Sequence, residues 1–472
     1  EISLNQFYGI ELDDFAHEIA ILALWLTKHQ MNVEFFKEFG RTNPSLPLTD
    51  AGNIVQGNAC RLDWEEVCPK KEENEIYILG NPPYLGESMQ SIQQKEDKSI
   101  VFNGIKNYKK QDYISCWFLK ASRYLDKNVS SAFVSTSSIC QGIQVPMLWM
   151  PIFNLGIEIS FAYKPFPWTN NAKGNAGVTV IIIGLQLIKK GKKLLFQDGF
   201  TNVVDNINAY LIPGRDIIVE KRKQLLSKLP VMMKGNGVYD DGNFMLNSEE
   251  KICLLKEGGH ELIQFIRPIV GSKEFINGLN RWCIWIEENN LKEAMNIDFI
   301  NRRVNKVREW RKTAGLTARE YANTPYRFKG INVADKSLII IPSVSSQRRN
   351  YIPIGFLSPD HIVTDAALMI LDSPAFVLGI ISSKLHMLWV RVLAGRLKMD
   401  FRYSSGICYN TFPFPNISKQ RKEELTQCTL NIIDERLKHS EKTLAQLYDP
   451  DKMPEGLKEA HHQNDLAVER CY

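Results

Sequence analysis

A short turn after an apolar strand carries the residue types best suited to chemistry. The apolar run 76–80 ends in a glycine and leads directly into Asn81, Pro82, Pro83 and Tyr84. Proline fixes its own φ and restricts the residue before it, so both Asn81 and Pro82 are predicted to be extended. The buried strand therefore ends in a stiff corner that offers two oxygen acceptors, the Asn81 amide and the Pro82 carbonyl, beside the aromatic ring of Tyr84.

Such a corner suits a planar amine, for example the exocyclic N6 of adenine. Its nitrogen is a poor nucleophile because the lone pair is conjugated into the ring. Two fixed acceptors that take the amine hydrogens favour a pyramidal nitrogen, and one well-placed dipole contributes about 3 kcal/mol. Stacking on Tyr84 adds roughly 1–3 kcal/mol per base, and a base inside a duplex must first be flipped out. The alternative is a rigid turn with no chemical role.

In this strand context the tetrapeptide resembles motif IV, the catalytic motif of amino-directed methyltransferases that use S-adenosylmethionine (SAM). "FYGIEL" places Glu11 at a strand end, where the acid of this family binds the ribose hydroxyls, and Leu12 would pack on the cofactor adenine. "GNACRLDW" resembles motif III, which implies cofactor contacts at Asn58 and Ala59. Asn58 stands where Asp is common. Taken alone, Glu11 reads as a surface acid or a helix cap.

A later aromatic segment supplies candidates for the second face of a flipped base. "KPFPWTNNAKGNAGVTVIIIGL" resembles motif VIII, in which an aromatic residue stacks on the adenine. Phe166 aligns best with that position, and Trp168 is the alternative. Either ring reads equally well as part of a core corner.

Longer segments resemble one class of enzyme over nearly all 472 residues. "EFINGLNRWCIWI", "SSQRRNYIPIGFLSPD" and "AGRLKMDFRYSSGICYNTFPFP" are similar to the MmeI/YeeA-like restriction–modification enzymes. These are single chains that join a nuclease, an adenine methyltransferase and a target-recognition domain. The resemblance implies double-stranded DNA as the partner, SAM as the cofactor and a cytoplasmic location in a bacterium or archaeon.

Two parts of the family pattern are missing from the sequence. The SAM glycine loop, motif I, would lie before the strand of "FYGIEL", and the nuclease would lie further upstream. We therefore expect the chain to be a C-terminal fragment that lacks the N-terminal region of the enzyme. This fragment alone is expected to bind SAM poorly and to be inactive.

Charge is distributed unevenly along the chain and indicates where DNA would bind. Residues 1–100 carry 8 Lys/Arg against 17 Asp/Glu, a balance of −9, whereas residues 301–350 carry 12 against 3, a balance of +9. The candidates for phosphate contact are Arg302, Arg303, Lys306, Arg308, Arg311 and Lys312. The candidates for base contact are Gln347, Arg348 and Arg349. An exposed helix face is the rival interpretation of the first set.

Alternating strand and helix patterns predict an α/β fold with a mostly parallel, wound sheet, as in SAM-dependent methyltransferases. Within it, residues 13–30 are predicted to form a helix that is apolar almost all round and therefore buried. We assign residues 1–190 to the catalytic domain, 191–247 to a linker, 248–415 to a mixed α/β target-recognition domain and 416–472 to a helical C-terminal region.

Composition excludes several other classes. The longest clean apolar run, 19–26, is far below the roughly 18 to 20 residues that cross a bilayer, so no membrane association is expected. The nine cysteines and eight histidines show no metal-ligand spacing, so we predict no metal and reduced thiols. Two rivals remain. One is a DNA-binding module without catalysis. The other is a protein-glutamine methyltransferase of the release-factor type, whose peptide substrate does not need the large basic domain.

Overall fold

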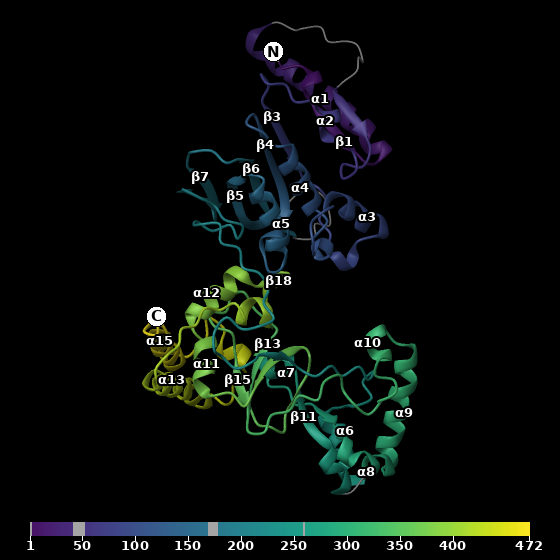
Figure 1. Cartoon of the computed structure of the whole chain (residues 1–472), viewed down its shortest axis with the longest axis vertical. Helices are drawn as coiled ribbons and strands as arrows, with labels where there is room; N and C mark the ends of the chain where they lie inside the picture. The colour runs from purple at the N-terminus through teal and green to yellow at the C-terminus, as the bar shows by residue number, and fades with distance from the viewer. Residues whose placement is uncertain (1, 41–51, 169–177, 258–259) are drawn as a thin grey trace. The chain divides into compact units, whose positions relative to one another are not determined.

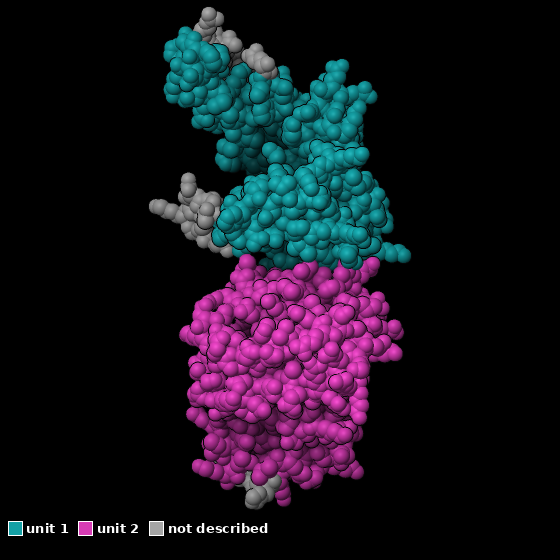
Figure 2. Space-filling model, turned by 90° about the vertical axis from the view of Figure 1, so that its left-hand side faces the viewer, with its two compact units in different colours: residues 1–218 teal, residues 219–472 magenta. Residues whose placement is uncertain are grey.

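The chain forms two compact units. The computed structural model describes residues 2–40, 52–168, 178–257 and 260–472. Unit 1 covers Glu1–Ile218 and unit 2 covers Val219–Tyr472, and Figure 2 colours them separately.

Unit 1 contains two sheets (Figure 1). In the smaller sheet β1 (Tyr8–Glu11) and β2 (Asn53–Gln56) pair in parallel, with α1 (Asp14–Phe39) between them in the chain. The larger sheet has the strand order β3-β4-β6-β5-β7-β8. Its strands are β3 (Ile76–Gly80), β4 (Val129–Thr136), β5 (Ile157–Trp168), β6 (Val178–Leu187), β7 (Lys193–Gln197) and β8 (Phe200–Val204).

The large sheet is mixed, so the prediction of a mostly parallel sheet is wrong. The pairs β3–β4 and β5–β7 are parallel, and the pairs β4–β6, β5–β6 and β7–β8 are antiparallel. The reason is that β6 runs back along β5 and then lies between β4 and β5. The predicted α/β class is confirmed.

Helices form the core of unit 1 together with the large sheet. Of these, α4 (Ser115–Tyr124) contacts β4 and α5 (Gln144–Asn154) contacts β5, whereas α3 (Ile92–Val101) contacts α4 and α2 (Trp64–Val67) contacts β1. Phe118 of α4 is fully buried, and its ring lies 5.3 Å from that of Phe133 and 6.1 Å from that of Trp149. Such edge-on aromatic pairs stabilise the helix–sheet contact beyond their buried area.

The first helix and the strand before the Asn-Pro-Pro-Tyr turn are less buried than predicted. The described part of unit 1 buries no residue of α1, and Phe15, Ile19 and Leu26 are exposed by 74%, 46% and 54%. On β3, Tyr77 and Leu79 are exposed by 68% and 76%, because within the described residues this strand pairs only with β4. The apolar pattern identified both elements but not their burial.

The predicted linker 191–247 is wrong over its first part. β7 and β8 lie within it and extend the catalytic sheet, and Leu195 of β7 is only 1% exposed. The two strands are short and stand between Lys, Asp and Gly residues, so the whole stretch reads as polar in the sequence. Further along, β9 (Met233–Lys234) pairs with a strand of unit 2.

Unit 2 contains three small sheets and a set of helices. The strands are β9, β10 (Met245–Leu246), β11 (Ile266–Val270), β12 (Trp282–Ile284), β13 (Leu338–Pro342), β14 (Val344–Ser345), β15 (Gly355–Leu357), β16 (Ile362–Val363), β17 (Ala367–Leu371), β18 (Gly395–Leu397) and β19 (Asp400–Arg402). They form the sheets β10-β12-β11-β16, β15-β13-β17-β9 and β14-β19-β18.

The helices of unit 2 are α6 (Ser248–Glu257), α7 (Ser272–Asn277), α8 (Leu291–Asn296), α9 (Asp298–Thr313), α10 (Leu316–Arg319), α11 (Ala375–Ile381), α12 (Lys384–Leu393), α13 (Lys419–Leu437), α14 (Leu444–Leu447) and α15 (Glu455–Glu469). The last three confirm the helical C-terminal region. No single helix of the described residues is long and apolar enough to cross a membrane. Only the pair of α11 and α12, bent by 54°, passes that test together, and most residues of α11 are buried in the protein.

Candidate active site

Three strands of the large sheet end at the same edge. β4 is parallel to β3 and antiparallel to β6, and β6 is antiparallel to β5, so β3, β4 and β5 run in one direction. Their carboxyl ends, Gly80, Thr136 and Trp168, therefore lie on one side. Ligands bind beyond this edge in α/β sheets, and the Asn-Pro-Pro-Tyr turn begins there.

The turn presents its first residue to solvent and anchors itself through the second. Asn81 is exposed, Pro82 is buried and Tyr84 is half-buried against the core of unit 1. Among the described residues the Asn81 side chain has no hydrogen-bond partner. An exposed amide on a backbone held by two prolines is available to a ligand without giving up an internal bond.

The chain just after the turn is fixed by the start of α4. The Asp112 carboxylate accepts a hydrogen bond from the Leu85 backbone N–H at 2.7 Å and another from the Ser138 hydroxyl at 3.2 Å. The Leu85 carbonyl in turn accepts from the Tyr113 N–H at 3.0 Å and from Gln90 Nε2 at 2.7 Å. Both backbone groups of Leu85 are therefore held, so the turn is fixed at its far end as well as at β3.

The candidate cofactor residues form a second corner. Glu11 ends β1 and pairs in register with Gln56 of β2, and the Gly57 N–H donates to the Glu11 carbonyl at 2.8 Å. The structure thus brings Glu11 beside the loop that carries Asn58 and Ala59. Glu11 is half-buried, whereas Leu12 is 71% exposed. A carboxylate beside an uncovered apolar side chain suits a ribose joined to a flat base.

The Asn58 side chain is engaged within this loop. Its Nδ2 donates to Asp97 Oδ2 and its Oδ1 accepts from the Cys60 N–H, both at 2.9 Å. Ala59 accepts from Trp64 Nε1 at 2.9 Å through its backbone carbonyl. In this structure Asn58 holds the loop together, in contrast to the free amide of Asn81.

Asp97 is the buried centre of that network. Its carboxylate is 2% exposed and also accepts from Tyr113 Oη at 2.7 Å and from Arg61 Nε at 2.6 Å. Burial alone would raise the pKa of Asp97, but the donors from Tyr113, Asn58 and Arg61 together hold its pKa below the usual value. Burial, together with the hydrogen bond to Asp97, raises the pKa of Tyr113, so this phenol stays protonated and donates.

The aromatic candidates lie at the end of β5, next to a bulge. The register of β5 on β6 shifts between Tyr163 and Phe166, where one extra residue enters β5 at Lys164-Pro165. Bulges re-aim side chains and are frequent beside active sites. The Phe166 and Trp168 rings are half-buried, with centroids 6.4 Å apart. The segment 169–177 of the motif VIII resemblance lies outside the described residues.

The basic cluster on α9 divides into exposed and buried members. Ile300, Val304, Val307 and Arg311 are buried along one face, whereas Arg302, Lys306 and Lys312 are exposed. Lys312 pairs with Glu309 at 2.7 Å, and Arg308 donates to the Asn305 side chain. Arg303 is half-buried and donates to the carbonyls of Asn243 and Met245.

Arg311 is wrongly predicted as a phosphate contact. Its side chain is 0% exposed and its guanidinium donates to five backbone carbonyls, those of Val238, Tyr239, Tyr321, Thr324 and Arg327. Burial lowers its pKa, and every donor group is committed to the protein. Arg311 is therefore a structural residue that joins α9 to two loops.

The candidates for base contact lie on the loop after β14. Gln347 and Arg348 are exposed, and Arg349 is half-buried. Arg348 forms an ion pair with Asp451, and the Gln347 N–H donates to Asp400 at 3.2 Å. Because ion pairs between exposed side chains contribute little to stability, the Arg348 guanidinium can leave Asp451 for another acceptor at small cost.

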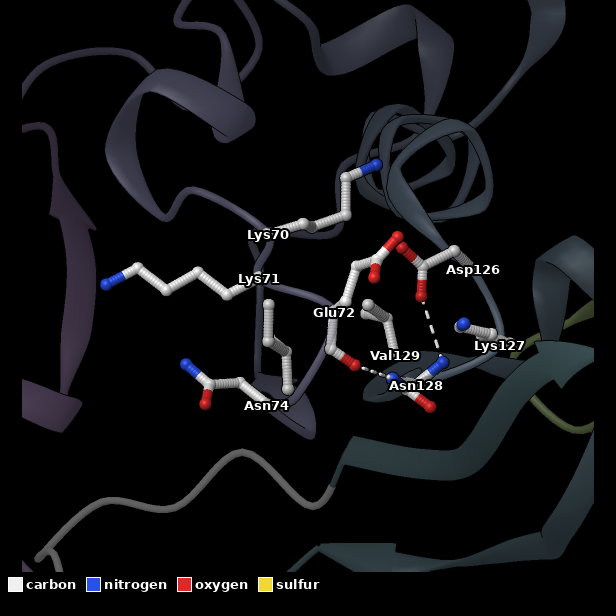
Figure 3. A pocket seen from close by; sticks show the side chains of 9 residues that line it. Lys70, Lys71, Glu72, Asn74, Asp126, Lys127, Asn128 and Val129 are labelled. Atoms are coloured by element: carbon white, nitrogen blue, oxygen red, sulfur yellow. Dashed lines mark hydrogen bonds between the residues drawn. The ribbon is translucent and has the colours of Figure 1, made fainter.

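A hollow of about 390 Å³ lies at the other edge of the large sheet (Figure 3). It is lined by Lys70, Lys71, Glu72, Asn74, Ile76, Asp126, Lys127, Asn128 and Val129. Ile76 and Val129 are the first residues of β3 and β4, so the hollow is on the opposite side from Asn81. Within the described ranges no group of three His, Cys, Asp or Glu side chains is placed to hold a metal ion.

Sequence reasoning missed the residues that hold the two corners. Asp97, Asp112 and Tyr113 lie in helices or at a helix start, where an acid is normally read as a cap. Leu85 and Asp112 are 27 positions apart, and Asn58 and Asp97 are 39 apart. No local pattern reports such pairs, although an acid followed by a tyrosine at the start of an apolar helix was visible.

Comparisons with known proteins identify the domains of the chain. Three family models match consecutive parts of the chain: the MmeI DNA-methyltransferase domain over residues 1–197, the MmeI target recognition domain over 213–416 and the MmeI C-terminal domain over 417–472. The fold and these matches define the class, a methyltransferase domain joined to a target recognition domain. The chain belongs to the MmeI family, which confirms the resemblance.

Two relatives match over the whole chain. "DNA methyltransferase A" of Bacillus subtilis (strain 168) is 42% identical over 475 residues, which cover 100% of this chain and 54% of that protein. The solved structure of the type IIL restriction–modification enzyme MmeI in complex with DNA is 37% identical, with a TM-score of 0.91, and the match covers 100% of this chain and 64% of that one. The chain thus spans about half the length of its curated relative.

Proposed function

We propose that this chain is the catalytic and DNA-recognising part of a restriction–modification enzyme that transfers a methyl group from SAM to N6 of a flipped-out adenine. The observation that carries the proposal is the exposed Asn81 amide, which has no partner among the described residues and is held on a stiff, doubly anchored turn. The match to the MmeI DNA-methyltransferase domain supports it.

Each residue of the turn has a distinct role in the proposal. The Asn81 amide oxygen and the Pro82 carbonyl accept the two hydrogens of the exocyclic amine and direct its lone pair outward. Tyr84 stacks on one face of the base, and Phe166, with Trp168 as the alternative, stacks on the other. The protein supplies position and preorganised acceptors rather than a strong base.

The corner at the ends of β1 and β2 fits the cofactor. The Glu11 carboxylate would accept from the two ribose hydroxyls, and the exposed Leu12 side chain and the backbone of Asn58 and Ala59 would line the adenine. SAM, when bound, supplies the electrophilic methyl group. The Glu11 carboxylate, which has no partner among the described residues, and an uncovered apolar side chain lie in one corner, as such a ligand needs.

Recognition of double-stranded DNA is proposed for unit 2. The exposed side chains of Arg302, Lys306 and Lys312 are suited to phosphates, with Arg303 and Arg308 partly engaged elsewhere. The exposed Gln347 and Arg348, with the half-buried Arg349, remain the candidates for base edges. The match to the MmeI target recognition domain, which includes all of these residues, supports this role.

We further propose that the full-length protein contributes a region that packs on unit 1. The apolar surface of α1 and the exposed Tyr77 and Leu79 of β3 are surfaces that another element would cover. On this proposal the present chain alone binds SAM weakly and does not methylate DNA, and the full-length protein acts in the cytoplasm of a bacterium or archaeon.

The test uses the full-length protein, labelled SAM and genomic duplex DNA. Asn81→Ala is expected to lower the rate of methyl transfer by roughly 100-fold, as the loss of one preorganised acceptor does. Asn202→Ala is the matched control, because Asn202 is an exposed amide on β8 of the same sheet. Equal rates for the two variants would refute the assigned role of Asn81. Modification of a base other than adenine would refute the N6 proposal.

The rival interpretations give different results in the same experiments. A DNA-binding module without catalysis predicts that the full-length protein binds DNA in calorimetry but neither binds SAM nor methylates. A protein-glutamine methyltransferase predicts label on a release factor instead of on DNA. The target recognition match argues against the second rival, because a peptide substrate has no use for that domain.

A further inference from the structure

Two neighbouring residues just before α4 hold the two corners of the candidate active site. Asp112 contacts the chain that leaves the Asn-Pro-Pro-Tyr turn, and Tyr113 contacts the network below the loop at 57–61. Both side chains are buried, with exposures of 6% and 5%. Buried polar groups of this kind are costly unless they are paired. Asp112 accepts from the Ile114 N–H at the start of α4 at 3.4 Å and more closely from Leu85, whereas the Tyr113 hydroxyl donates to Asp97 of α3.

Asp112 holds the turn to the neighbouring strand end. One carboxylate oxygen takes the Leu85 N–H at 2.7 Å and the other takes the hydroxyl of Ser138, just beyond β4, at 3.2 Å. Its own N–H donates to Gln144 Oε1 at 3.0 Å. The position of Leu85, and with it that of Tyr84, is therefore tied to β4 as well as to β3.

Tyr113 holds the other corner through Asp97. Its hydroxyl donates to Asp97 Oδ2 at 2.7 Å, the same oxygen that accepts from Asn58 Nδ2 at 2.9 Å. Its ring packs edge-on against Trp117 at 5.2 Å, which fixes the ring independently of the hydroxyl. Removal of the hydroxyl alone would take one hydrogen bond from Asp97 and leave its bond from Asn58 less firmly placed.

We propose that Asp112 and Tyr113 are positioning residues that set the base-binding turn and the cofactor-binding loop relative to one another. Because they are adjacent in the chain, both corners are held to the same short segment, each through its own side chain. Transfer between two bound molecules needs the reacting atoms about 3–3.5 Å apart, and a misplacement of about 1 Å can cost roughly 100-fold in rate. This inference rests on the proposed function, since it assigns one corner to the base and the other to SAM.

The proposal predicts a separation of kinetic effects in the full-length protein. Asp112→Asn keeps the side-chain shape but weakens the acceptor for the Leu85 N–H. We expect this variant to lower kcat at least 10-fold, because the misplaced turn affects the reacting geometry. Its KM for SAM should stay within 2-fold of wild type. Tyr113→Phe keeps the ring and is expected to raise the KM for SAM at least 5-fold with kcat within 3-fold of wild type, because it loosens only the cofactor loop.

Matched controls in the same unit separate this role from general stability. Asp126→Asn changes a carboxylate that also accepts a backbone N–H, that of Asn128 at 2.9 Å, but at the opposite edge of the sheet. Tyr108→Phe changes a half-buried tyrosine whose ring stacks on Phe102 at 5.6 Å. Both controls are expected to keep kcat and KM within 2-fold of wild type. Melting temperatures of all variants are measured in parallel.

The outcomes are distinguishable. Wild-type protein that methylates no DNA refutes the proposed function. Active wild type with Asp112→Asn and Tyr113→Phe no different from their controls refutes the positioning roles alone. Kinetic changes that simply follow the melting temperature, with kcat and KM altered together in both variants, also refute them. If Tyr113→Phe does not fold, Asp97→Asn tests the same link, and a raised KM for SAM in that variant supports the proposal whereas an unchanged KM overturns it.

Discussion

Arg311→Met tests whether the buried arginine of α9 supports the fold or contacts DNA. Methionine keeps most of the aliphatic volume but removes five hydrogen bonds, of 2.8 to 3.3 Å, to the carbonyls of residues 238, 239, 321, 324 and 327. Bonds from a charged donor contribute about 1.5–3 kcal/mol each in mutational series. The guanidinium also bears the cost of burying a charge, which offsets part of that gain.

Taking about 1 kcal/mol net for each bond gives roughly 5 kcal/mol, and some carbonyls will recover water, so we expect a loss of about 3–5 kcal/mol in the free energy of unfolding. A loss of this size is comparable with the whole stability of a small domain, about 5–15 kcal/mol. The two loops that Arg311 joins to α9 should therefore open before the rest of unit 2.

Hydrogen exchange measured on peptides covering residues 236–243 and 320–329 reports that local opening, and urea unfolding reports the global loss. Arg302→Met is the control, because Arg302 lies exposed on the same helix with one bond, to the Asp298 carbonyl at 3.3 Å. Arg311→Met should speed exchange in both peptides, and the control should not. If both variants were equally stable and Arg311→Met alone weakened DNA binding, the assignment of Arg311 to the structure would be wrong.

Three further predictions concern a buried histidine, a phosphate contact and the stacking of the flipped base. Burial lowers the pKa of His386 to about 3, so below pH 6.5 the unfolded chain binds a proton that the folded chain does not, and stability falls. Between pH 7 and 5 the free energy of unfolding in urea should therefore fall by about 2 kcal/mol less for His386→Gln than for wild type. Equal losses would contradict this. Lys306→Gln should lower by about 0.9 the magnitude of the slope of the logarithm of the DNA association constant against log salt, without changing site preference. Titration at several salt concentrations measures this slope. An unchanged slope would show that Lys306 does not contact DNA. In full-length protein with SAM present, Phe166→Ala should reduce the fluorescence change of 2-aminopurine at the target base more than Trp168→Ala does, since a stacked base contributes roughly 1–3 kcal/mol, and the reverse order would assign the stacking role to Trp168.

The strands and turns that create the site were predictable from sequence because each depends on local chemistry. An apolar run that ends in Gly80 and two prolines permits few structures other than a strand and a stiff corner. Glu11 at the end of β1 followed from the same logic, and parallel pairing then brought it beside Gly57. Family resemblance added the roles of these residues, which local chemistry alone left open.

Burial and long-range contacts were less predictable. The apolar pattern of α1 indicated a helix but not how much of it the protein covers. Arg311 was grouped with its exposed neighbours because charge was counted rather than position. The spacing of Ile300, Val304, Val307 and Arg311, at i, i+4, i+7 and i+11, places the arginine on the apolar stripe of the helix, and that signal was present in the sequence. The link between Leu85 and Asp112 has no such signal, because it depends on how α4 packs.

The uncovered apolar side of α1 has a consequence for colloidal behaviour. Phe15, Leu22 and Leu26 are exposed by 74%, 48% and 54% on one side of a helix of 26 residues. Helices that present such a surface to water associate through it, so a polypeptide of this length should self-associate as its concentration rises and should sediment faster than its mass of 54.1 kDa predicts. Charged substitutions along that side would keep it dispersed, which gives a practical route to concentrated samples.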